Sequence, residues 1–228
     1  MTAYIFDSET TGLNDPQLVE AAWLRLADIG TLEVTHEFLA RYKPAKPIEL
    51  GALATSHILD EELADCPPHD SFALPADIQY LIGHNVDYDW GVIGQPDIKR
   101  ICTKALSSLL WPTADSHSQS AMIYLHYRSE APGLLRNAHA ALDDVQNCRL
   151  LLIKIMDALA ARLGRQVASW DELWELSEDA RLPRIIRFGK HAGSAIADIP
   201  ADYKSWLLRQ DNIDPYLRKA LNKQSSGA

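Results

Sequence analysis

The sequence YIFDSETTGL at residues 4–13 carries the pattern from which the fold is predicted. Tyr4-Ile5-Phe6 is an apolar run typical of the end of a short buried strand, and Asp7-Ser8-Glu9 follows it directly. Residues two apart in a strand point to the same face, so the carboxylates of Asp7 and Glu9 are expected to converge. Buried neighbouring carboxylates need a cation, and Mg²⁺ and Mn²⁺ favour oxygen ligands. The alternative is an exposed turn before Gly12.

The chain after this stretch predicts a mixed α/β sheet. Residues 18–26 and 34–42 favour strands and are separated by turn residues, so three strands in a row indicate a meander. Shorter elements follow, with strands expected at 78–82 and 98–102 and helices at 49–65 and 104–110. Strands followed by alternating strands and helices are typical of the α/β class.

The clearest single element is a helix over residues 141–163. Its apolar residues recur at spacings of three and four, which places them on one face: Ala141, Val145, Cys148, Leu152, Ile155 and Leu159. Gly164 is the expected C-terminal stop. The sequence therefore predicts an amphipathic helix packed on the sheet.

A second, smaller unit is expected from residue 166, which gives domains 1–165 and 166–228. Ser169-x-x-Glu172 matches a capping box, residues 184–188 and 194–196 suggest a hairpin, and 201–209 and 214–222 suggest helices. This predicts a small α+β module.

Residues 181–228 contain nine Lys and Arg against four Asp and Glu, whereas residues 1–180 contain 13 against 27. The basic module is expected to bind nucleic acid or a partner, although a solvated basic face explains Arg181, Arg184, Arg187 and Lys190 equally well.

The composition excludes several classes of protein. The chain has 228 residues, 47% hydrophobic and 23% charged, as in soluble globular proteins rather than disordered or coiled-coil chains. A net charge of −9 argues against nonspecific coating of nucleic acid, but it is compatible with a nuclease, whose metal site is acidic. Neither a membrane span nor a secretory signal is expected. Cys66, Cys102 and Cys148 are few and widely spaced, which favours a reducing cytoplasm over disulfides or a zinc site.

Two further polar clusters lie beside predicted elements. The segment GHNVDYD at residues 83–89 follows an apolar strand, and HAALDD at residues 139–144 opens the long helix. Taken alone, the first is better explained as a polar loop. Acidic residues near a helix N-terminus also favour the helix dipole, which is sufficient to explain Asp143 and Asp144.

The three clusters occur in a set order: Asp7-x-Glu9, then His84-Asn85-x-x-x-Asp89, then His139-x-x-x-x-Asp144. In this order they resemble the DEDDh branch of the DnaQ-like 3′–5′ exonucleases, over roughly residues 3–163. Four further segments resemble the bacterial exodeoxyribonuclease X type of this family: ICTK at 101–104, LWP at 110–112, PGL at 132–134 and FGKHAG at 188–193. The resemblance implies a ribonuclease H-like mixed sheet flanked by helices.

The resemblance also implies a site and a reaction. Two ions of Mg²⁺ or Mn²⁺ would be held by Asp7, Glu9, Asp89 and Asp144. Glu9 would also be catalytic, and His139 would be the general base, because a histidine ordinarily titrates near neutral pH. Asp87 and Asp143 are the alternates if the alignment is displaced by a residue or two. The alternative for His139 is a helix-flanking histidine bonded to backbone.

The expected substrate contacts are Thr11, Gly12, Leu13, His57 and Asn85. In the family the turn after the first motif meets the 3′-terminal nucleotide. Gly12 permits a close backbone approach and Leu13 would pack on the terminal base. A tight turn with Leu13 in the core is an equal alternative. His84 is expected to be structural.

The predicted function is a metal-dependent 3′–5′ exodeoxyribonuclease that releases nucleoside 5′-monophosphates from DNA 3′ ends, in DNA repair. A homodimer is a further expectation from the family, and no membrane partner is expected. An exoribonuclease of the same fold is the first alternative, because no motif here reads a 2′-hydroxyl. A catalytically silent nucleic-acid-binding adaptor is the second, and the intact set of four carboxylates and His139 argues against it.

Overall fold

The computed structural model describes residues 2–225. The chain divides into two compact units, Met1–Ser177 and Glu178–Ala228. The division falls later than the predicted boundary after residue 165, because the first part of helix α7 (Trp170–Arg181) packs into the first unit. The Trp170 ring lies 6.3 Å from that of Tyr80, and the Cys102 N–H donates to Ser177 Oγ at 2.8 Å.

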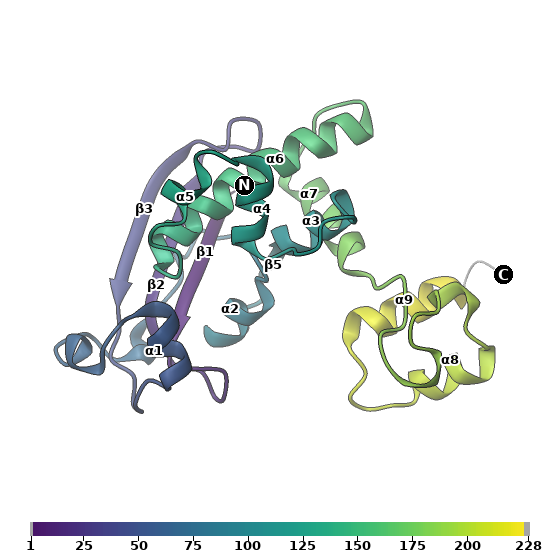
Figure 1. The fold of residues 1–228 in the computed structure, drawn as a ribbon, viewed down its shortest axis with the longest axis horizontal. Helices are drawn as coiled ribbons and strands as arrows, with labels where there is room; N and C mark the ends of the chain where they lie inside the picture. Colours follow the sequence, from purple (N-terminus) through teal and green to yellow (C-terminus); the bar gives the residue numbers. More distant parts are fainter. Residues whose placement is uncertain (1, 226–228) are drawn as a thin grey trace. The chain divides into compact units, whose positions relative to one another are not determined.

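Five strands form one mixed sheet in the order β3-β2-β1-β4-β5 (Figure 1). Their bounds are β1 Ala3–Thr10, β2 Leu18–Leu26, β3 Val34–Arg41, β4 Tyr80–Gly83 and β5 Lys99–Cys102. The pairs β1–β2 and β2–β3 are antiparallel, which confirms the predicted meander. The pairs β1–β4 and β4–β5 are parallel, so β1 lies at the centre of the sheet.

Strand β1 is longer than the sequence predicted. The apolar run ends at Phe6, but the strand continues to Thr10 because β2 pairs with it that far, with Glu9 opposite Glu20 and Thr10 opposite Leu18. The pairing register shifts between Glu9 and Thr10. Such irregularities re-aim side chains and are common beside active sites.

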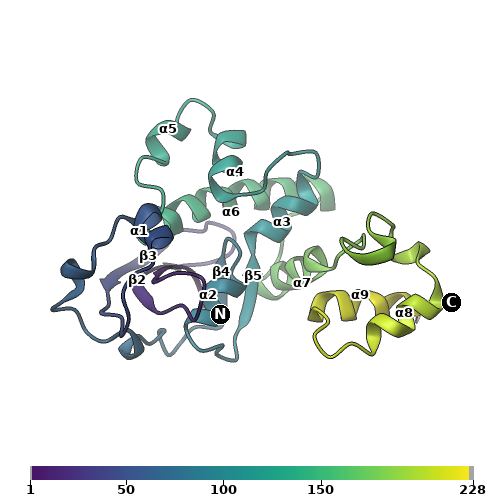
Figure 2. The same cartoon turned by 60° about the horizontal axis from the view of Figure 1, so that its bottom comes forward.

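Helices make up much of the rest of the first unit. Their bounds are α1 Leu50–Ser56, α2 Asp87–Val92, α3 Thr103–Leu110, α4 Gln119–His126, α5 Ala131–Leu134 and α6 Ala141–Leu163. Helix α6 has the predicted bounds, and Gly164 ends it with φ +71°. It packs on β1 and β2, and α3 and α4 pack on it in turn. Figure 2 shows the sheet, α6 and then α4 and α5 as successive layers.

The opposite face of the sheet carries an aromatic cluster. The Phe6 and Phe72 rings stack at 5.6 Å, and Trp23 stacks on Phe38 at 5.3 Å. Phe72 belongs to the segment before β4, so this connection covers the face with apolar rings instead of a long helix. The helix predicted at 49–65 is shorter, because His57 takes a left-handed conformation (φ +58°) and ends α1.

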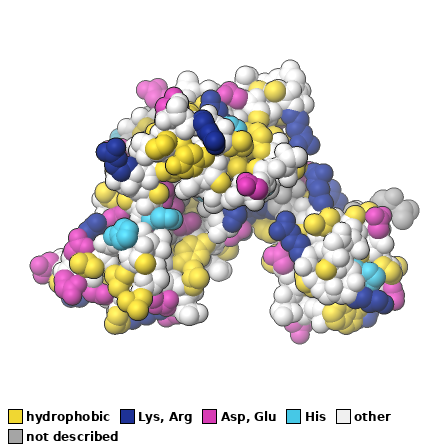
Figure 3. Space-filling model, in the orientation of Figure 1, with side chains coloured by type: hydrophobic (Ala, Val, Ile, Leu, Met, Phe, Trp, Pro, Cys, Tyr) yellow, Lys and Arg dark blue, Asp and Glu magenta, His cyan; other side chains and the backbone are white. Residues whose placement is uncertain are grey.

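The second unit has a small core of its own, formed by Ile186, Ile196, Ile199, Leu207, Leu217, Ala220 and Leu221. Helices α8 (Ala201–Leu208) and α9 (Pro215–Ser225) contribute to it. The predicted hairpin is reduced to a single antiparallel bridge between Ile185 and Ala195. Lys, Arg and His side chains lie beside hydrophobic ones on the visible face of this unit (Figure 3).

Within residues 2–225, no helix combines the length and the apolar character that a membrane span requires. The three cysteines are free thiols, and Cys102 and Cys148 are buried.

Candidate active site

Four carboxylates from three elements lie together near the end of β1. Asp7 and Glu9 come from β1, Asp89 from α2 and Asp144 from the first turn of α6. The charges of Asp89, Asp144 and Glu9 all act on Asp7, in that order of strength. The structure therefore brings together the four residues that the family resemblance implied as metal ligands.

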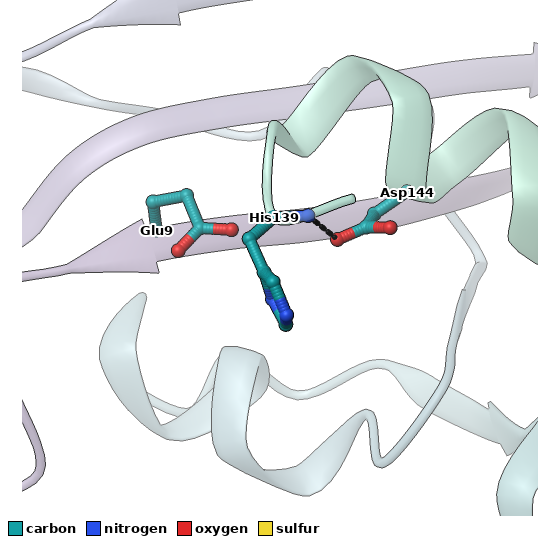
Figure 4. Close-up of side chains that lie close together, drawn as sticks. All are labelled: Glu9, His139 and Asp144. Carbon is teal, nitrogen blue, oxygen red and sulfur yellow. Dashed lines mark hydrogen bonds between the residues drawn. The ribbon is translucent and has the colours of Figure 1, made fainter. Parts of the chain in front are cut away.

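His139 lies between two of these carboxylates. Single ligand atoms of Glu9, His139 and Asp144 lie within 4.8 Å of one another. Figure 4 shows the imidazole projecting from the loop before α6, with Glu9 on one side and Asp144 on the other. The ring is exposed, so a solvent molecule can reach it.

The backbone of His139 is fixed independently of its ring. Its N–H donates a hydrogen bond of 3.0 Å to Asp144 Oδ2. The residue has φ +72°, a left-handed conformation that is uncommon for a residue other than glycine and is concentrated at functional sites. Asp144 thus holds the loop that presents the imidazole.

Asp89 is held by Ser8, in the part of β1 that β4 leaves unpaired. Strand β4 ends at Gly83, and its pairing with β1 extends only as far as Ile5. Beyond that point the N–H and hydroxyl of Ser8 both donate to Asp89 Oδ1, at 3.1 and 2.7 Å. The side chain of Asp89 therefore takes the place of a strand partner.

The two alternate carboxylates are placed differently. Asp87 is exposed and forms an ion pair with Arg100 of β5. Asp143 accepts a hydrogen bond of 3.5 Å from the Asn137 side chain. Neither alternate is among the charges that act on Asp7.

The electrostatics of the cluster favour a bound cation. Burial raises the pKa of Asp7 well above its usual range, and the neighbouring Asp89 and Asp144 charges raise it further. Burial and the Asp144 charge raise the pKa of Glu9 to about 8, and burial raises that of Asp89 to about 7. Burial also raises the pKa of Asp144. Carboxylates this close are costly to ionise together without a compensating charge, so the donor set fits divalent metal ions.

Two residues that support the site were not predicted. The side-chain amide of Gln119, at the start of α4, donates to both Asp144 Oδ1 and the Asp144 carbonyl, each at 3.1 Å. Glu20 of β2 is buried; its Oε1 accepts from the Ala141 N–H at 3.1 Å and its Oε2 pairs with Arg41 at 2.9 Å. Both contacts fix the N-terminus of α6, and neither belongs to a local motif.

The turn after β1 is tied to α2. Tyr88, beside Asp89, contacts the Thr10 hydroxyl at 2.6 Å and donates to the Gly12 carbonyl at 3.1 Å. Gly12 has φ +148°, and a Cβ there would lie 2.2 Å from the carboxyl group of Glu49. The Glu49 carboxyl group ends a flexible side chain and can move aside, so it is the positive φ, which residues with a Cβ rarely adopt, that favours glycine in this turn.

The remaining predicted substrate residues differ in exposure. Leu13 is 81% exposed, so it lies outside the core. Thr11 is buried, and its hydroxyl accepts from the Gln17 N–H at 3.1 Å. His57 and Asn85 are both exposed and both have positive φ.

His84 has contacts suited to the predicted structural role. Its ring nitrogens lie 3.1 Å from Thr103 Oγ1 and 2.8 Å from the His117 carbonyl. Burial lowers its pKa to about 4, so the ring is neutral at physiological pH. It joins the end of β4 to α3 and to the loop before α4.

No family model matches the chain. The chain is 27% identical to exodeoxyribonuclease 10 of Escherichia coli (strain K12) over 224 residues, which cover 95% of this chain and 96% of that protein. Exonuclease X in complex with 5′ overhanging duplex DNA has a TM-score of 0.58 at 23% identity, over 77% of this chain and 99% of that one.

Two further solved structures share the fold. Escherichia coli exonuclease I in complex with a dT13 oligonucleotide has a TM-score of 0.55 at 19% identity, over 72% of this chain and 42% of that one. The nuclease domain of 3′hExo, a DEDDh family member bound to rAMP, has a TM-score of 0.50 at 12% identity, over 73% of this chain and 94% of that one. The comparisons confirm the predicted ribonuclease H-like fold and the resemblance to DEDDh exonucleases of the exodeoxyribonuclease X type.

Proposed function

We propose that this relative of exodeoxyribonuclease 10 is a metal-dependent 3′–5′ exodeoxyribonuclease, which releases nucleoside 5′-monophosphates from DNA 3′ ends. The observation that carries the proposal is the convergence of four carboxylates and an exposed imidazole at one end of β1. The exonuclease class is the one to which its named relatives belong. The choice of DNA as the substrate rests on the sequence similarity to exodeoxyribonuclease 10, which extends along nearly the whole chain.

Asp7, Glu9, Asp89 and Asp144 would hold two ions of Mg²⁺ or Mn²⁺. The raised pKa values of these carboxyl groups support this assignment, because a cation would offset the repulsion that burial intensifies. When bound, such ions lower the pKa of a coordinated water molecule and stabilise charge on a leaving oxygen.

His139 would accept the proton of the attacking water at a ring nitrogen. Its position between Glu9 and Asp144 supports this role, and the Asp144 carboxylate keeps its loop in place through the backbone N–H. Glu9 would assist by orienting the water beside the imidazole. Gln119 and Ser8 would act as positioning residues, because each donates a hydrogen bond to one of the carboxylates.

Leu13 and Gly12 would meet the 3′-terminal nucleotide. The exposure of Leu13 and the close backbone turn at Gly12 support this proposal. Thr11 would contribute by holding the turn, since its hydroxyl bonds within the loop. His57 and Asn85 would be further substrate contacts, because both are exposed.

An exoribonuclease is the second candidate. The observation in its favour is the shared fold with a nuclease domain solved with rAMP. The same proposal includes a cytoplasmic location, a DNA-repair role, a homodimer and the binding of nucleic acid or a partner by the basic second unit. Composition and the family resemblance support these points.

Digestion of 5′-labelled single-stranded DNA, duplex DNA and RNA, with Mg²⁺, Mn²⁺ or EDTA, tests the proposal. We expect a ladder that shortens from the 3′ end of DNA, mononucleotide products and complete inhibition by EDTA. Faster cleavage of RNA than of either DNA would replace the exodeoxyribonuclease with the exoribonuclease. Binding of all three without cleavage under any metal condition would favour the adaptor.

A further inference from the structure

The second unit exposes large aromatic side chains that its own core does not use. Phe188 is 49% exposed and Trp206 is 46% exposed. Phe188 opens the FGKHAG segment singled out in the sequence, and Trp206 belongs to α8. The proposed hydrolysis at the end of β1 does not account for either residue.

The FGKHAG segment and α8 are packed together. Gly189 has φ +67°, and a Cβ there would lie 2.7 Å from the Tyr203 hydroxyl, so the backbone approaches this ring closely. The rings of His191 and Tyr203 lie 4.5 Å apart, and Tyr203 stacks on Trp206 at 5.4 Å with an interplanar angle of 27°. A row of rings therefore runs from the FGKHAG segment to the exposed face of Trp206.

Cations without partners lie along the same segment. Among the residues that the structure describes, the exposed side chains of Arg184, Arg187 and Lys190 form no ion pair and no hydrogen bond. Lys219 and Lys223 of α9 differ, because they pair with Glu178 and Asp179 at 3.1 and 2.9 Å. The positive charge near Phe188 is therefore available to a ligand, whereas that on α9 is partly neutralised.

The charge of the unit favours a polyanionic ligand. Residues 178–228 contain nine Lys and Arg against six Asp and Glu, whereas residues 1–177 contain 13 against 25. Exposed aromatic rings beside unpaired cations are the combination by which proteins bind single-stranded nucleic acid, since bases stack on the rings and phosphates meet the cations. A protein partner would not require unpaired cations beside the rings.

We propose that Arg187, Phe188, Lys190, Tyr203 and Trp206, here called the aromatic–basic surface, bind single-stranded DNA. Trp206 and Phe188 provide stacking platforms for bases, and Arg187 and Lys190 contact phosphates. The identity of the polyanion as DNA rests on the proposed function. The binding itself does not require the hydrolytic site.

Fluorescence anisotropy of the full chain with a labelled oligothymidylate, in EDTA to prevent cleavage, tests the proposal. Trp206→Ala should raise the Kd by about 5-fold or more, and Trp206→Phe should restore most of the affinity. An Arg187→Gln/Lys190→Gln variant should also raise the Kd and reduce its salt dependence. Lys223→Gln is the matched control, because this cation is already paired, and its Kd should stay near that of the parent.

Hydrolysis of the p-nitrophenyl ester of thymidine 5′-monophosphate separates this proposal from the proposed function. The substrate is a single nucleotide, so its kcat/KM should be unchanged in all of these variants. If the parent hydrolyses it and the Kd for oligothymidylate is unchanged in both the Trp206 and the Arg187/Lys190 variants, the surface does not bind DNA. If the parent hydrolyses neither this ester nor DNA, the proposed function fails. Should Trp206→Ala not fold, as judged by thermal unfolding, the Arg187/Lys190 variant decides.

Discussion

The Ser8 hydroxyl donates a hydrogen bond of 2.7 Å to Asp89 Oδ1, and the backbone N–H of Ser8 donates to the same oxygen at 3.1 Å. Ser8 lies between Asp7 and Glu9 in β1, so a single strand both supplies two carboxylates and fixes a third. These two bonds also lower the pKa of Asp89, and so act against burial, which raises it. The position of Asp89 therefore depends on Ser8.

Ser8→Ala should weaken metal-dependent activity without abolishing it, because the backbone N–H still holds Asp89. Loss of a group that orients a metal ligand typically costs about 10- to 100-fold in metal affinity, and the low end is expected here. The measurement is the Mn²⁺ concentration that gives half-maximal cleavage. Ser8→Thr keeps the hydroxyl and should match the parent, whereas an unchanged Mn²⁺ requirement in Ser8→Ala would contradict this role.

Gln119→Ala should reduce kcat by roughly 10-fold with little change in KM, because Asp144 loses an amide donor to its carboxylate and to its carbonyl. Gln119→Glu should be more damaging, because it adds a negative charge beside Asp144. Steady-state kinetics on single-stranded DNA provide the readout. Gln146→Ala, at an exposed position of α6, is the control. Equal kinetics for Gln119→Ala and the parent would show that Asp144 needs no such support.

The metal-free protein should lose stability as the pH rises. The pKa values of Glu9 and Asp89 are raised to about 8 and about 7 in the folded state, so the folded state binds more protons than the unfolded state between about pH 4.5 and pH 8. Stability is greatest below the unfolded pKa values and declines through this window. Thermal unfolding in EDTA at about pH 5 and pH 8 measures the decline, and Mn²⁺ should raise the Tm more at the higher pH.

Glu9→Gln isolates one part of this effect. At about pH 8 in EDTA the variant should be more stable than the parent by about 1–2 kcal/mol, after allowance for the partial exposure of Glu9, and near pH 5 the two should be similar. Its cleavage activity should be lost. A variant less stable than the parent at the higher pH would show that Glu9 is not under electrostatic strain.

Leu13→Ala should raise KM for single-stranded DNA by about 5-fold, which corresponds to roughly 1 kcal/mol of lost apolar contact. The Tm should not change, because the side chain is 81% exposed. Leu59→Ala, at another exposed leucine, is the control and should leave KM unchanged. A lowered Tm with unchanged KM would support the alternative of a purely structural turn.

The sequence allowed much of the fold to be predicted because its long elements have strong local patterns. Helix α6 matches its predicted bounds since its apolar spacing is regular over 23 residues and Gly164 ends it. Helices α2 and α4 were not predicted. The six residues of α2 follow His84-Asn85, so polar loop chemistry masks the helix that carries Asp89.

The residues of the site also divide into those that a local motif reveals and those that only the folded chain brings together. Asp7, Glu9, His139 and Asp144 lie in short motifs, which a single sequence can reveal. The supporting contacts join residues far apart in the chain: Ser8 to Asp89 across 81 positions, Gln119 to Asp144 across 25 and Glu20 to Ala141 across 121. Such pairs depend on how β1, β2, α2, α4 and α6 pack, and no local spacing encodes them.

Single-turnover cleavage of 5′-labelled single-stranded DNA by the parent and by His139→Ala, with Mn²⁺ binding measured on both proteins, tests the central claim most directly. The backbone N–H that holds Asp144 survives this substitution, so Mn²⁺ binding should be retained. The rate should fall by about 10²- to 10⁴-fold, the usual contribution of a general base. Cleavage from the 3′ end at the parental rate by a His139→Ala protein that binds Mn²⁺ normally would contradict the account.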